Sequence, residues 1–207
     1  MLADLSAAAS HYQWLGLLWH LFISFLLAAL LLGWEPVRRS ARLWIALPLV
    51  STAIVAAAAG NPFDGVVMGV TAMALLVAAL RRPAALAAWH WNWQTGTGLA
   101  SIAFAWAYPT FSANAASWVY AFGSPTGVLP VPTLALVIGF TLLTSAHQTR
   151  TWSTGLASVA AFYGAFGSVQ LGVTLDLGLL LGSLALIIAA APALLILPGR
   201  PGQRLVR

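Results

Sequence analysis

The sequence consists of seven predominantly apolar runs separated by short breaks, and few folds are open to a chain with this pattern. The runs span residues 14–33, 43–59, 65–80, 97–108, 131–146, 155–172 and 175–197. Most approach the roughly 20 apolar residues that an α-helix needs to cross a bilayer. Only 6% of the residues are charged, whereas soluble domains carry about 25%. We therefore expect an all-α integral membrane protein, with residues 1–207 forming a single transmembrane helical domain.

The arginines favour a bundle of seven transmembrane helices over one of six. The sixth run, 155–172, is the weakest because it contains glycines, serines and Gln170, and six helices remain possible. With seven helices, all nine arginines fall on one side of the membrane. Basic residues in short loops mark the cytoplasmic side. The prediction is an N-terminus outside and a C-terminus inside, with Asp64 and Asp176 at outer helix ends.

The residue types that are missing exclude several kinds of chemistry. The chain has no cysteine, which rules out disulfides, iron–sulfur clusters and thiol nucleophiles. All nine basic residues are arginine, which rules out a lysine Schiff base and a P-loop lysine. No group of Asp, Glu and His residues shows metal-ligand spacing, and we expect neither a metal nor a cofactor. The net charge of +5 lies in short loops, so it indicates topology and not nucleic-acid binding.

Asp64 and Asp176 are the first candidates for a site. Two carboxylates at outer helix ends could serve a proton or cation path. A structural interpretation is preferred for both. Residues 61–64, Asn-Pro-Phe-Asp, are typical of an N-cap, a proline at the first helical position and an acid in the first turn. Residues 174–176, Thr-Leu-Asp, suggest the same arrangement, and an acid there complements the helix dipole.

Three more polar residues lie within apolar runs. A histidine inside a membrane helix, here His20, is a functional candidate by default. An interhelical hydrogen bond is the preferred alternative, because no second histidine is placed to complete a haem site. Tyr163 and Gln170 are seven residues apart on one helix face, where they would line a polar cavity or bond to neighbouring helices. With Asp64 and Asp176 these three form the candidate lining of a binding site, and no catalytic set is recognisable.

Small residues at four-residue spacing in the sixth run predict close helix packing. They are Ala160, Gly164, Ser168 and Gly172. Such a ladder lets the backbone of another helix approach closely. We expect this groove to face a helix of the same bundle or of a partner, and not lipid.

Four short motifs carry a resemblance to other proteins. They are Gly-Asn-Pro-Phe at 60–63, Tyr-Pro-Thr-Phe at 108–111, Pro-Val-Pro-Thr at 130–133 and Gly-Val-Thr-Leu-Asp at 172–176. Together with the layout of apolar runs, they resemble a family of uncharacterised bacterial multi-pass membrane proteins, a domain of unknown function with a Pro-Cys-Pro-Thr-like motif. Members often have cysteine where this chain has Val131 and histidine where it has Thr110. The resemblance covers roughly residues 43–190, implies the fold and supplies no activity.

These observations favour a non-enzymatic multi-pass protein of the bacterial inner membrane. Its role would be that of an accessory or scaffolding component that packs against partner membrane proteins, or against its own copies, within the lipid bilayer. The alternative is a small-solute transporter or channel, with the polar residues of the first and sixth runs along the route. A membrane enzyme using Asp64, Asp176 and His11 at the outer face ranks last. A transporter requires a polar cavity, which distinguishes it from a scaffold.

Overall fold

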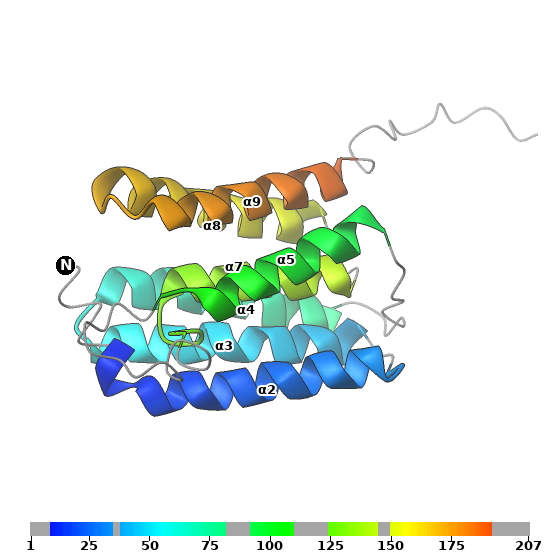
Figure 1. Ribbon diagram of the computed structural model, residues 1–207, viewed down its shortest axis with the longest axis horizontal. Helices are drawn as coiled ribbons and strands as arrows, with labels where there is room; N and C mark the ends of the chain where they lie inside the picture. Colours follow the sequence, from blue (N-terminus) through cyan, green and yellow to red (C-terminus); the bar gives the residue numbers. More distant parts are fainter. Residues whose placement is uncertain (1–8, 35–37, 82–91, 110–123, 145–149, 192–207) are drawn as a thin grey trace, which may run out of the picture.

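The computed structural model describes residues 9–34, 38–81, 92–109, 124–144 and 150–191. All regular structure within these residues is helical (Figure 1). The helices are α2 (Gln13–Leu31), α3 (Arg38–Ala58), α4 (Pro62–Arg81), α5 (Trp93–Ala107), α7 (Pro130–Leu143), α8 (Arg150–Gln170) and α9 (Leu177–Ala190), with a 3-10 turn, η2 (Thr174–Asp176), before α9. Each of these seven α-helices overlaps one of the seven apolar runs, with ends that differ by several residues.

The lengths and surfaces of the helices suit a membrane. Three segments are long and apolar enough to cross one, namely Gln13–Leu31, Ser40–Ala58 and Pro62–Leu80, and α7 and α9 are shorter apolar helices. Large apolar side chains point outward, as at Phe25 on α2, Val70 on α4 and Leu181 on α9. Soluble monomers rarely expose contiguous apolar surface of this extent. The chain is therefore a helical membrane protein.

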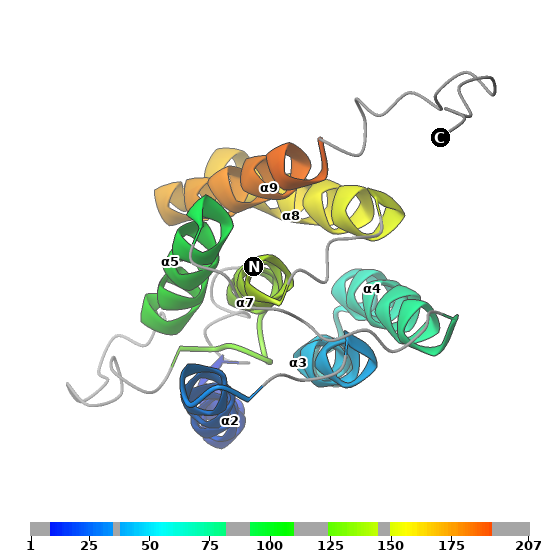
Figure 2. The same ribbon diagram turned by 90° about the vertical axis from the view of Figure 1, so that its right-hand side faces the viewer.

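Helix α7 lies at the centre of the bundle, with the other helices arranged around it (Figure 2). All but one of its residues are buried. A helix that is hydrophobic on every side is expected to be enclosed by its neighbours. Two glycines permit its close approach to α5. A Cβ at Gly98 would lie 2.9 Å from the Gly139 carbonyl oxygen, and one at Gly139 would lie 2.7 Å from the Gly98 carbonyl oxygen.

The chain enters α7 through an irregular segment, residues 124–129, that is buried. The hydroxyls of Ser124 and Thr126 both donate to the carbonyl of Ala105. Gly127 has φ +75°, and the Trp19 ring occupies the space where its side chain would be, so only glycine fits there. The Gly127 N–H donates to Thr133 Oγ1 at 2.8 Å. Such internal hydrogen bonds allow irregular backbone to lie at membrane depth.

The two ends of the α3–α4 hairpin differ in charge. Arg42 is buried, and its Nη1 donates to the carbonyl of Ala78 at 2.9 Å, which ties the start of α3 to the end of α4. Asp64 lies at the opposite end of the hairpin, in the first turn of α4. This arrangement agrees with the predicted sorting of acids from arginines. Of the nine arginines, Arg42 alone has a side chain that the structure describes.

Candidate binding cavity

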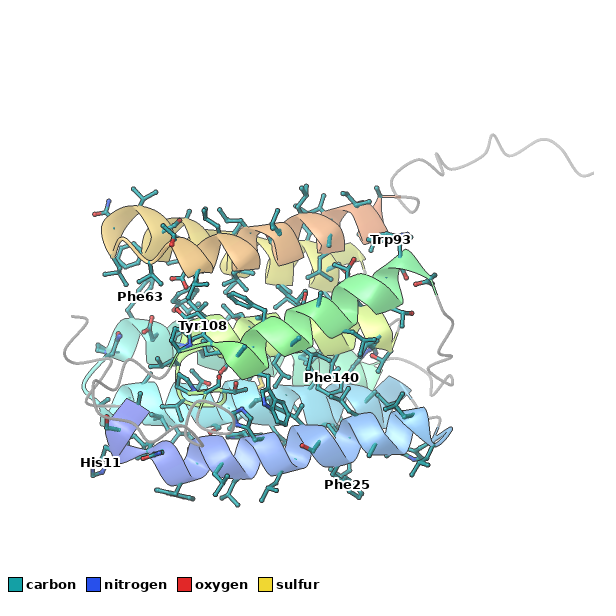
Figure 3. The ribbon with its side chains drawn as sticks, viewed as in Figure 1. His11, Phe25, Phe63, Trp93, Tyr108 and Phe140 are labelled. Atoms are coloured by element: carbon teal, nitrogen blue, oxygen red, sulfur yellow. The ribbon has the colours of Figure 1, made fainter. Side chains whose placement is uncertain are left out.

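One end of the bundle holds a partly open cavity of about 310 Å³. Figure 3 shows Phe63 and Tyr108 at this end and Trp93 at the other. The walls come from the starts of α4 and α7, the ends of α5 and α8, and the segment before α9. Ligand cavities in proteins span about 300–1,000 Å³ and are mostly apolar with a few polar groups. This cavity meets both criteria, and its polar lining consists of Asn61, Asp64, Tyr108, Tyr163 and Asp176.

The first carboxyl group of the cavity belongs to Asp64. Asn61 caps α4, because its Oδ1 accepts from the Asp64 N–H at 3.2 Å, and its Nδ2 donates to Asp64 Oδ2 at 2.7 Å. Pro62 is the first residue of the helix. Tyr163 from α8 donates its hydroxyl to Asp64 Oδ1 at 2.6 Å. Asp64 therefore belongs to a helix cap and also joins α4 to α8.

The second carboxyl group belongs to Asp176, which is 2% exposed. Tyr108, at the end of α5, donates its hydroxyl to Asp176 Oδ1 at 2.6 Å. Among the described residues, no donor is hydrogen-bonded to Oδ2. Asp176 lies against the backbone of α8 at Gly167, where a Cβ would collide with Oδ2. The site thus contains a second tyrosine–aspartate pair, which joins α5 to the start of α9.

Aromatic rings cover much of the remaining wall. The ring centroids of Phe63 and Phe162 are 5.8 Å apart, and those of Phe162 and Phe166 are 6.0 Å apart. The side chains hydrogen-bonded to the two carboxyl groups, two tyrosines and one asparagine, are all neutral. Burying a carboxylate without a compensating charge is costly. The cavity therefore holds two acidic groups whose hydrogen-bonded neighbours carry no charge. The rest of its wall is aromatic and apolar.

The structure corrects the interpretation of the two acids as helix caps alone. The capping arrangement predicted for Asn61, Pro62 and Asp64 is confirmed, but the Asp64 carboxyl also accepts from Tyr163. Asp176 lies in the first turn of η2 and at the N-cap position of α9, as expected, but its side chain makes no capping hydrogen bond to α9. The Asp176 carboxyl instead accepts from Tyr108 at the end of α5.

Two of the candidate lining residues lie elsewhere. Gln170 is exposed at the end of α8 and is not among the residues lining the cavity. His20 is buried in α2, also outside the lining. Its Nδ1 donates to the carbonyl of Gly16 in the same helix at 2.8 Å. Its contact with another helix is aromatic, an edge-to-face arrangement on Trp106 of α5 at 4.5 Å. At Nδ1 the hydrogen bond is thus within α2, and the hydrogen bond to another helix expected for His20 stays a prediction.

The small-residue ladder packs within the chain. Ala160 is fully buried, and a Cβ at Gly164 would lie 2.9 Å from the Asp176 carbonyl oxygen and 3.0 Å from Leu180 Cγ. The groove at Gly164 therefore faces α9, as predicted. Ser168 is partly buried and donates to the Gly164 carbonyl at 2.6 Å. The prediction is wrong at Gly172, which follows the end of α8 with φ +68° and open space around it.

Leucine at position 164 should therefore destabilise the protein. We expect Gly164→Leu to lower the free energy of unfolding by about 1–3 kcal/mol, since overpacking has that cost. Gly155→Leu is the matched control, because Gly155 lies in the same helix with nothing within 4 Å of its Cβ position. The measurement is thermal unfolding in nanodiscs followed by tryptophan fluorescence. Equal losses in both variants would contradict the assigned packing.

No protein-family model matches this sequence, and comparisons with curated proteins and with solved structures find no match either. Of the two positions singled out by the resemblance, Val131 lines the cavity and Thr110 lies outside the described residues. Within the described residues, no three His, Asp or Glu side chains come together as metal ligands would.

Proposed function

We propose that this chain is a multi-pass carrier of small solutes in the inner membrane of a bacterium. The observation that supports this proposal is the convergence of two buried tyrosine–aspartate pairs on one cavity. Ionisable residues inside membrane proteins are costly and usually mark the path of a substrate or ion. A well-formed and mostly apolar cavity that also holds such groups is the default candidate for a binding site.

The packing of α8 weakens the alternative of a scaffold. That interpretation relied on a groove of small residues that would be free to receive a partner helix. The groove at Gly164 is already occupied by α9 of the same chain. The outer surfaces of α2, α4 and α9 are apolar and suit lipid as well as they would suit protein. The cavity is thus the more specific feature of this molecule.

The two pairs also suggest how a carrier of this fold would move. Asp64 and Tyr163 join α4 to α8, and Asp176 and Tyr108 join the start of α9 to α5. A solute that bound to one of these carboxyl groups would displace the tyrosine hydroxyl from it. The link between the two helices would then loosen. Helix rearrangement around a fixed site is the usual basis of alternating access.

Transport can be tested on the purified chain. Proteoliposomes would be loaded with a mixture of amino acids, amines, organic acids and sugars, and the retained solutes measured by mass spectrometry over time. We expect one class of solute to leave faster than from protein-free liposomes. This loss should be slower with Asp64→Asn and Asp176→Asn combined. Equal retention of every solute with and without protein would contradict the proposal.

The proposed topology makes a separate prediction. Because all nine arginines sort to one side when seven helices span the membrane, fusions of a reporter after Arg82 and at Arg207 should both report the cytoplasm. Paired fusions to alkaline phosphatase and to green fluorescent protein measure this. A periplasmic signal at either position would overturn seven spans with the N-terminus outside.

A further inference from the structure

We propose that the solute is a small organic cation with an apolar body, bound between Asp64, Asp176 and the aromatic wall of the cavity. This inference rests on the proposed function and adds the chemical class of its solute. Three features of the cavity support it, namely its charge, its rings and its size.

The charge of the cavity favours a cation. Asp64 and Asp176 both line it, and the side chains hydrogen-bonded to them are neutral. Asp176 Oδ2 has no hydrogen-bond donor among the described residues, although the side chain is 2% exposed. An anion would meet two acids here, and a neutral solute would leave both uncompensated. A ligand cation can supply the missing charge-assisted hydrogen bond or ion pair.

The rings favour an organic cation over an inorganic one. Phe63, Phe162 and Phe166 line the cavity together with the two tyrosines. Metal cations such as Ca²⁺ and Mg²⁺ require a shell of oxygen ligands, which this largely carbon wall does not offer. An alkylated ammonium group is attracted both to carboxylates and to the faces of aromatic rings. Its apolar part would lie against Leu129, Val131 and Leu171, which complete the wall.

The size of the cavity restricts the cation to a small one. A volume of about 310 Å³ is close to the lower limit for ligand sites. A single ring carrying one quaternary ammonium group is a suitable probe. Benzyltrimethylammonium is such a molecule, and benzyl alcohol and benzylsulfonate provide neutral and anionic counterparts with the same ring.

Binding would be measured by isothermal titration of the full chain in nanodiscs. We expect saturable binding of benzyltrimethylammonium, at least tenfold tighter than of benzyl alcohol, and no saturable binding of benzylsulfonate. Asp176→Asn should weaken binding of the cation by about 30-fold, as expected when one partner of a buried charge pair is removed. Phe25→Leu is the control, because Phe25 lies on the exposed face of α2 and is not among the residues lining the cavity, and it should leave binding unchanged.

A second variant keeps the inference testable if Asp176→Asn does not fold. Phe166→Leu retains bulk but removes a ring from the wall, and it should weaken binding of the cation by about fivefold while leaving binding of benzyl alcohol nearly unchanged. Equal affinity for the cation and for benzyl alcohol, or full affinity in both variants, would overturn the inference. Transport of a neutral or anionic solute in the proteoliposomes would overturn it too, while leaving the carrier proposal standing.

Discussion

Gly139→Leu is expected to be among the most damaging single substitutions in this protein. Gly139 lies in the central helix α7, where a Cβ would be 2.5 Å from Ile102 Cγ1 and 2.7 Å from the Gly98 carbonyl oxygen. Backbone cannot move aside as the end of a flexible side chain can, so α5 and α7 must separate. We expect a loss of about 3 kcal/mol in the free energy of unfolding, at the upper end of overpacking costs.

Gly96→Leu provides the control for this prediction. Gly96 lies in α5 with nothing within 4 Å of its Cβ position, so leucine there should change stability little. Both variants would be compared with the unmodified chain by thermal unfolding in nanodiscs. If Gly139→Leu unfolds at the same temperature as Gly96→Leu, the close crossing of α5 and α7 is incorrect.

Thr133→Val should also destabilise the protein strongly, although it hardly changes the volume of the side chain. Thr133 Oγ1 accepts from the Gly127 N–H at 2.8 Å, donates to the Leu129 carbonyl at 2.7 Å and lies 3.0 Å from Thr52 Oγ1. Valine would leave the buried Gly127 N–H without a partner. A buried polar group left unsatisfied costs about 1–3 kcal/mol, and we expect a loss in that range.

The chain offers a closely matched comparison in the same helix. Thr141 is as buried as Thr133, but its hydroxyl has no hydrogen-bond partner among the described residues. Thr141→Val should therefore be neutral or slightly stabilising. The difference between the two variants, measured as unfolding temperature, isolates the hydrogen bonds from the change of residue type. Similar shifts in both would show that the hydroxyl of Thr133 does not hold the segment before α7.

The helices could be predicted from the sequence because apolar runs of this length have few alternatives in a chain with so little charge. The placement of Asp64 and Asp176 at the same end of the bundle also followed from the charge pattern, and both line one cavity. The end of α8 was harder to place. Gly172 continues the four-residue spacing, but the helix stops at Gln170 and Gly172 adopts a positive φ. Spacing alone does not reveal where a helix ends.

The pairing of the carboxyl groups could not be predicted. Tyr163 is 99 residues from Asp64, and Tyr108 is 68 residues from Asp176. Which tyrosine meets which acid depends on how the helices pack around α7. Tyr108 appeared in a motif of the sequence, though only as part of a resemblance. Nothing in the sequence pointed to the contact between Gly167 and Asp176. The four-residue spacing of small residues passes through Gly164 and Ser168 and does not include Gly167.

We expect the cavity to be a water-accessible pocket on the outer side of the membrane, and cysteine labelling tests this most directly. The chain has no native cysteine, so Val131→Cys would introduce a single thiol into the cavity wall. A membrane-impermeant maleimide added to intact cells should label it. Leu181→Cys, on the exposed apolar face of α9, should stay unlabelled in the lipid. Labelling of Val131→Cys only after the cells are opened, or not at all, would contradict a cavity that is open to water on the outer side.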